Sequence, residues 1–187
     1  MRGNTLAIGL ASLLLLATLE AQGFEDGEEW KGPLRLGKKK VDYLHFYFHD
    51  MLDAKNPTPL IVAEANITQS SPTLFGMVRV MDQPLTEGPN LTSKMIGKAQ
   101  GIFASVSQTE PTIFMEMNFL FTEGKFNGSE LTVVGRNPIL NRVREMSVVG
   151  GNGVFRLARG YARLRTYSFN ATNLNAIMEY HVTVIHY

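Results

Sequence analysis

The sequence contains no cysteine among its 187 residues. This absence excludes disulfides, thiol nucleophiles, CxxC redox chemistry and zinc sites built on cysteine. An excess of either charge is also missing, because 18 Lys and Arg face 17 Asp and Glu for a formal net charge of +1. No whole-molecule field therefore favours a polyanionic partner. With 44% hydrophobic residues, the chain is too apolar to be disordered, and its length fits one domain plus a short processed segment.

The common motifs of nucleotide and hydrolase chemistry are absent as well. No GxxxxGK[ST] and no GxSxG occurs. The run Gly151-x-Gly153 carries Arg156 at the third glycine position and opens a strand, which is the wrong context for a dinucleotide loop. No HxxEH-like carboxylate pattern accompanies the four histidines, so we expect structural or surface roles for them, with no metal and no cofactor; they are His45, His49, His181 and His186.

The N-terminus has the parts of a secretory signal peptide. A short basic start precedes an apolar run from Leu6 to Leu19, and Ala21-Gln22-Gly23 offers small residues for cleavage. The run is shorter than the roughly 18–20 residues that cross a bilayer as a helix. We predict a signal peptide over residues 1–23, a flexible arm over 24–40 and the folded domain over 41–187. Secretion to the extracellular space or apoplast follows, with no membrane attachment after cleavage and no nucleic-acid partner.

Four N-x-S/T sequons agree with export and predict a glycoprotein; their acceptors are Asn66, Asn90, Asn127 and Asn170. A secreted chain without disulfides must be stabilised by its core, by oligomerisation, or by both.

The mature chain is predicted to be all-β. Turn formers such as Asn127-Gly128 separate the strand-like runs. Eight antiparallel strands most economically close into a barrel, and a two-sheet sandwich is the alternative that periodicity leaves open. The eight runs are Tyr43–Met51, Leu60–Ile67, Leu74–Asp82, Gly97–Ser107, Thr112–Thr122, Ser129–Gly135, Val154–Ser168 and Ala176–Tyr187.

Two charged residues are candidates for a pocket. Asp50 follows Phe46 and Phe48 on one face of the first strand, so it is either a desolvated general acid or a strand-ending Asp bonded to the next turn. Arg144 lies in the segment from Asn137 to Gly151, which we expect to be a long functional loop. Its guanidinium either stabilises a phenolate or carboxylate at a pocket mouth or pairs with a neighbouring carboxylate such as Glu145.

Arginines are concentrated between Leu131 and Met178. A surface that binds an anionic polysaccharide is one interpretation, and arginines around a solvated barrel rim are the other.

The motifs resemble those of the plant dirigent proteins over nearly all of the mature chain, closer to the branch that contains pterocarpan synthases than to pinoresinol-forming members. The matching stretches are FYFHD (Phe46–Asp50), FGMVRVMDQPLTEGP (Phe75–Pro89), GKAQGIFA (Gly97–Ala104), NFLFTEGKFNGS (Asn118–Ser129), GRNPILNRVREMSVVGGNGVFRLARGYA (Gly135–Ala162) and the C-terminal HY.

The resemblance implies an eight-stranded antiparallel barrel of the allene oxide cyclase-like or dirigent type, assembled as a homo-oligomer, with a trimer favoured and a dimer possible. It implies a stereochemical auxiliary without oxidative activity. A laccase or peroxidase makes phenoxy radicals, for example from coniferyl alcohol, and the protein orients their coupling into lignans. The alternative is a dehydratase or cyclase of the pterocarpan synthase type that forms a quinone methide. A cell-wall carbohydrate-binding protein is the further alternative.

The resemblance also carries residue roles onto this sequence. Asp50 and Arg144 match the acid and the arginine that members of the family place in the pocket, and Phe48 lies beside Asp50 on the predicted inward face. Asn137 occupies the position of a second pocket acid of pinoresinol-forming members. An amide can hydrogen-bond but cannot act as an acid, so Asn137 departs from the pattern of pinoresinol-forming members; Asn137 and Phe48 are expected to contact the substrate.

Overall fold

The computed structural model describes residues 35–52 and 57–187. The predicted signal peptide and most of the predicted arm lie outside the described residues. Residues Gly37–Tyr187 form a compact unit, and its first strand begins at Lys40. In the described part of the chain, no helix has the length and apolar character needed to span a membrane.

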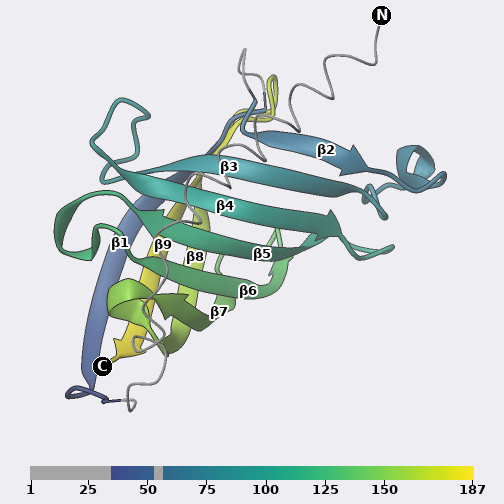
Figure 1. Cartoon of the computed structure of the whole chain (residues 1–187). Helices are drawn as coiled ribbons and strands as arrows, with labels where there is room; N and C mark the ends of the chain where they lie inside the picture. The colour runs from purple at the N-terminus through teal and green to yellow at the C-terminus, as the bar shows by residue number, and fades with distance from the viewer. Residues whose placement is uncertain (1–34, 53–56) are drawn as a thin grey trace, which may run out of the picture. The chain divides into compact units, whose positions relative to one another are not determined.

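The described residues of this unit form nine strands and three single-turn 3₁₀ helices (Figure 1). The 3₁₀ helices are η2 (Thr68–Ser70), η3 (Gly124–Phe126) and η4 (Gly153–Phe155). The strands are β1 (Lys40–Asp50), β2 (Pro59–Ala63), β3 (Val78–Thr86), β4 (Met95–Ser105), β5 (Thr112–Phe121), β6 (Glu130–Pro138), β7 (Arg144–Asn152), β8 (Arg159–Phe169) and β9 (Ala176–His186).

The predicted eight-stranded antiparallel barrel is confirmed. Hydrogen-bonded neighbours follow the order β1-β9-β8-β7-β6-β5-β4-β3-β2, and β1 also pairs with β3. The pairs Tyr47–Thr86 and Phe48–Leu85 close the ring, while β2 pairs with the other end of β3. β1 and β2 therefore share one edge of β3 as the two halves of an interrupted strand, and closure removes the edges that an open sheet would expose.

The prediction of a long loop over Asn137–Gly151 is wrong. β6 continues to Pro138 and β7 begins at Arg144, so only residues 139–143 connect them. β7 was missed because an arginine occupies its first inward position and two glycines, Gly150 and Gly151, weaken its far end.

The predicted strand over Leu74–Asp82 is also displaced, since β3 runs on through Pro84 to Thr86. Proline is tolerated there because it falls between the residues of β3 that pair with β2 and those that pair with β1.

The inward faces of the strands form one hydrophobic core. Side chains alternate on β5, with Met115, Met117, Phe119 and Phe121 buried. Aromatic rings fill much of the interior: the ring centroids of Phe46 and Phe119 lie 5.0 Å apart, and those of Phe46 and Tyr180 lie 5.6 Å apart.

Candidate active site

Asp50 ends β1 and continues its inward face. Its carboxylate is half-buried, and Gln83 of β3 donates a hydrogen bond from Nε2 to Oδ1 at 3.0 Å. Burial raises the pKa of Asp50 to about 6, although the bond from Gln83 and the charge of Arg79 act in the opposite direction. The partner of Asp50 is thus a neighbouring strand of the barrel wall rather than the following turn.

Gln83 is held in place by a short chain of hydrogen bonds through Thr58 and Met51. The side chain of Gln83 is fully buried, and its Oε1 accepts a bond from the hydroxyl of Thr58. Thr58 in turn accepts from the backbone N–H of Met51 at 3.1 Å. Asp50 is therefore held both through β3 and through the residues that follow it in the chain.

Arg144 begins β7 and is only 5% exposed. Its Nη1 donates to the carbonyl of Ile139 at 3.0 Å, and its Nη2 donates to the hydroxyl of Thr166 at 3.1 Å. Its Nε is buried and has no hydrogen-bond partner in residues 35–52 and 57–187. Burial lowers the pKa of the guanidinium, yet arginine stays charged in proteins. Within the described residues Arg144 forms no ion pair with a carboxylate, and such a buried cation is suited to bind an anionic group.

Tyr180 of β9 lies close enough to both Asp50 and Arg144 to interact with their charges. The phenol is fully buried, and burial raises its pKa above the ordinary value; the charges of Arg144 and Asp50 also act on it. Phe48 is 2% exposed, and its ring centroid lies 5.8 Å from that of Tyr180. Asp50, Arg144 and Tyr180 therefore belong to one end of the barrel, with Phe48 in its apolar floor.

Asn137 lies on the inward face of β6, at the same end of the barrel as the start of β7. It is 5% exposed, and its Nδ2 contacts Sδ of Met115 at 3.2 Å. Its Oδ1 is buried without a hydrogen-bond partner in the described part of the chain. The side chain contributes an unpaired acceptor to the interior.

The residues missed from the sequence are Gln83, Arg79 and Tyr180. Gln83 is a polar residue between the buried Met81 and Leu85, which is the same pattern that singled out Asp50. It was passed over because the predicted strand stopped at Asp82.

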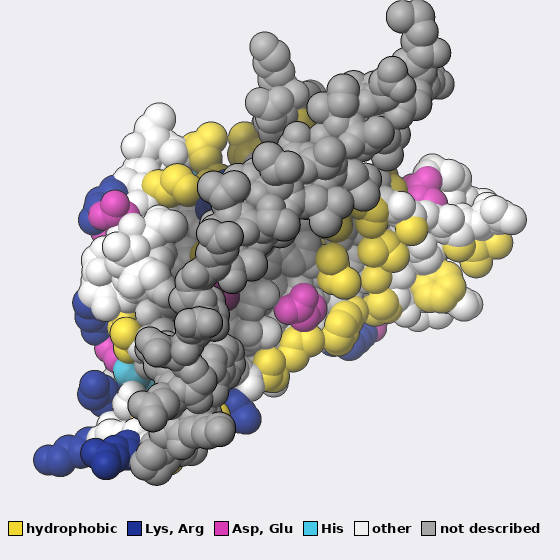
Figure 2. Space-filling model, viewed as in Figure 1, with side chains coloured by type: hydrophobic (Ala, Val, Ile, Leu, Met, Phe, Trp, Pro, Cys, Tyr) yellow, Lys and Arg dark blue, Asp and Glu magenta, His cyan; other side chains and the backbone are white. Residues whose placement is uncertain are grey.

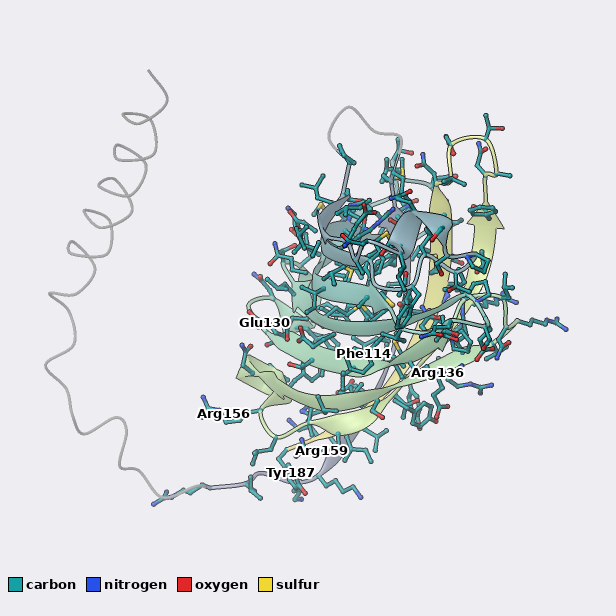
Figure 3. The ribbon with its side chains drawn as sticks, turned by 90° about the vertical axis from the view of Figure 1, so that its right-hand side faces the viewer. Phe114, Glu130, Arg136, Arg156, Arg159 and Tyr187 are labelled. Atoms are coloured by element: carbon teal, nitrogen blue, oxygen red, sulfur yellow. The ribbon has the colours of Figure 1, made fainter. Side chains whose placement is uncertain are left out.

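The arginine-rich region does not form one basic face. Arg144 points inward, whereas Arg136 pairs with Glu110 and Arg165 pairs with Glu179. Figure 3 shows Arg136 well apart from Arg156 and Arg159 on the outer wall. The acceptor asparagines of all four sequons are exposed, as glycosylation requires. Their glycosylation stays a prediction.

The Dirigent-like protein family model matches residues 41–185. The chain belongs to the dirigent family. It is 44% identical to Dirigent protein 21 of Arabidopsis thaliana over 178 aligned residues, and the alignment covers 94% of this chain and 93% of that protein. It is 45% identical over 177 residues to Pterocarpan synthase 1 of Glycyrrhiza echinata, with 93% of this chain and 92% of that protein covered.

A solved structure of a pterocarpan synthase dirigent protein superimposes with a TM-score of 0.76 and 47% identity, over 82% of this chain and 89% of that one. The likeness to this branch of the dirigent family is confirmed, and the fold is the one expected from it.

Proposed function

We propose that this dirigent-family protein forms a quinone methide from a phenolic substrate by acid-assisted loss of water and then directs ring closure, as a dehydratase of the pterocarpan synthase type. The observation that carries the proposal is the half-buried Asp50 carboxyl, whose pKa of about 6 leaves much of it protonated in mildly acidic solution. A proton donor is needed to expel a hydroxyl group, whereas the coupling of two radicals needs none.

The residues of the cluster fit this chemistry. The substrate phenol loses its proton to solvent water, and the guanidinium of Arg144 stabilises the phenolate that forms. The phenolate electrons move toward the carbon that bears the hydroxyl group, the C–O bond breaks, and the oxygen leaves with the proton of Asp50 as water. A second hydroxyl of the substrate then attacks this carbon. Its proton goes to the quinone-methide oxygen, and Asp50 regains the proton that the phenol lost, so the net change is loss of one water.

The apolar interior supplies the stereochemical control. Phe48 packs near Tyr180, next to Asp50 and Arg144. In this proposal the two rings act as apolar walls with few polar anchors that fix the orientation of a planar phenol. A difference of about 1.4 kcal/mol between two orientations already gives a tenfold ratio of products.

The test is an incubation of the purified protein with a hydroxylated isoflavanol and no oxidase. We expect a product lighter by one water with an enantiomeric excess, and Asp50→Asn should lower the rate by about 10²–10⁴-fold. Asp82→Asn is the matched control, because Asp82 lies on the outer face and pairs with Lys98. Lack of turnover by the wild type, or unchanged turnover by Asp50→Asn, would contradict the proposal.

The second candidate is stereoselective coupling of phenoxy radicals generated by a separate laccase or peroxidase. It is favoured by the likeness to proteins named only as dirigent proteins, such as Dirigent protein 21. An incubation of coniferyl alcohol with laccase, with and without this protein, separates the two. Optically active lignans would support the second candidate, and racemic lignans would contradict it. Secretion to the apoplast completes the proposal; fractionation of cells expressing the full chain tests it.

A further inference from the structure

Two histidines and a glutamate meet on the outer face of the barrel, away from the acid–arginine cluster. His45 of β1 lies directly opposite His181 of β9 in the strand register. Their rings are stacked, with centroids 4.5 Å apart and an interplanar angle of 21°. Glu179 precedes His181 by two residues and so projects from the same face. The cluster spans the seam between the first and the last strand of the barrel.

The three side chains direct their donor atoms at one another. Nε2 of His45 lies 2.9 Å and Nε2 of His181 lies 3.4 Å from the same oxygen, Oε1 of Glu179. One ligand atom from each residue falls within 4.8 Å of the other two. In a tetrahedral zinc site with bonds of about 2.0–2.2 Å, neighbouring ligand atoms are about 3.3–3.6 Å apart. The 3.4 Å separation of His181 Nε2 from Glu179 Oε1 already matches that spacing, and the 2.9 Å separation of His45 Nε2 from the same oxygen is shorter.

We propose that His45, Glu179 and His181 bind a divalent transition-metal ion, with Zn²⁺ and Cu²⁺ as the preferred ions. Two imidazole nitrogens and one carboxylate oxygen suit these ions, whereas Mg²⁺ and Ca²⁺ prefer oxygen ligands alone. The side chains of His45 and His181 are 45% and 60% exposed. Water can therefore complete the coordination from the solvent side.

Arg165 sets the expected strength of the site. Its Nε donates to Oε2 of Glu179 at 2.5 Å, which leaves Oε1 directed at the two histidines. The bond orients the carboxylate, as hydrogen bonds to the ligating side chains do in known metal sites. The positive charge of Arg165 also opposes a dication, so we expect affinity in the micromolar range rather than that of a structural zinc site.

A metal at this position would join strands that no covalent bond connects, in a chain without cysteine. β1 pairs with β3 through only two register pairs, Tyr47–Thr86 and Phe48–Leu85, so its other neighbour β9 carries most of its attachment. An ion bound to both β1 and β9 stabilises the folded state, because the unfolded chain does not hold the ligands together.

The test measures Zn²⁺ binding to the full chain without a polyhistidine tag, by isothermal titration calorimetry. We expect one equivalent of Zn²⁺ to bind, Cu²⁺ to bind more tightly, and Mg²⁺ not to bind. His45→Gln and His181→Gln should each weaken Zn²⁺ binding by about tenfold or more. His49→Gln, verified as folded by circular dichroism, is the control, since His49 is buried and bonded to Thr86.

Glu179→Gln separates a three-ligand site from a bare pair of surface histidines. Loss of the charged ligand should also weaken Zn²⁺ binding by about tenfold. An independent readout is thermal unfolding: Zn²⁺ should raise the Tm of the wild type and not that of His181→Gln. Zn²⁺ binding that Glu179→Gln leaves unchanged, or binding no tighter than that of the His45→Gln/His181→Gln double variant, would overturn the proposal.

Discussion

Asp50 and Asp82 show how the face of a strand decides the behaviour of a carboxylate. Asp82 projects outward from β3, where Lys98 and Gln100 donate to it and lower its pKa, with the bond from Lys98 as the largest cause. Asp50 projects inward, where burial raises its pKa to about 6. An aspartate on the outer face therefore keeps its charge to lower pH, whereas one on the inner face holds its proton to higher pH.

The raised pKa of Asp50 makes it a destabilising group at neutral pH. The folded state holds its proton up to about pH 6, whereas the unfolded chain loses it near 3.8, so stability falls as pH rises through this window. The difference corresponds to at most about 3 kcal/mol. Asp50→Asn should therefore raise the free energy of unfolding near pH 7 and change it little near pH 4, as measured by urea denaturation.

Asp82→Asn should behave differently, with a small loss near neutral pH, because its ion pair is exposed and worth little. A gain for Asp50→Asn that is equal at both pH values would show that the carboxyl is not desolvated in the folded state.

The same group sets the expected pH dependence of the proposed dehydration. General acid catalysis needs protonated Asp50, so the rate should fall about tenfold for each pH unit above the pKa of about 6. A profile of kcat/KM against pH, recorded without oxidase, measures this. A rate that stays level through that region would exclude Asp50 as the acid.

At the scale of the elements, the strands in which apolar and polar side chains alternate regularly were predicted from the sequence. β7, in which a residue of the candidate site breaks the alternation, was missed. β1, β5 and β9 were placed within a few residues because apolar side chains recur at every second position. β7 was hidden because Arg144 takes the inward position where an apolar residue is expected. The pairing of His45 with His181 was not accessible either, since it depends on a register between segments at opposite ends of the domain.

A glycine on the inward face of β4 lies too close to the neighbouring strand to be replaced by a larger residue. A Cβ on Gly101 of β4 would lie 2.1 Å from the carbonyl oxygen of Glu116 and 2.6 Å from the Cα of Met117. Backbone atoms cannot yield as a flexible side chain can. Gly101→Ala should therefore cost about 2–4 kcal/mol of stability in urea denaturation, because β4 must move away from β5.

Gly150→Ala is the matched control, since a Cβ there meets nothing within 4 Å. Its effect should stay within about 0.5 kcal/mol. Equal stabilities of the two variants would show that the β4–β5 approach is not as close as described.

At the scale of the whole molecule, the barrel wall exposes apolar residues in a row. Leu60, Val80 and Ile102 are neighbours across β2, β3 and β4, with exposures of 53%, 37% and 48%. Phe114 of β5, labelled in Figure 3, is also exposed and pairs with Ala104 of β4, whereas Glu116 lies opposite Ile102. Figure 2 shows hydrophobic side chains gathered on this part of the described surface. A hollow of about 460 Å³ includes Leu60 and Val80 in its lining. Contiguous exposed apolar surface of this kind marks interaction sites.

We propose that this surface joins copies of the chain into the homo-oligomer expected from the family resemblance. Ile102→Glu places a charge within the row and should convert the oligomer to monomer, as measured by size-exclusion chromatography with light scattering. Val149→Glu is the control, because Val149 is 41% exposed on β7, outside the row. The proposal fails for this surface if the wild type is monomeric or if Ile102→Glu keeps its mass, since an interface that excludes water cannot accept an unpaired carboxylate.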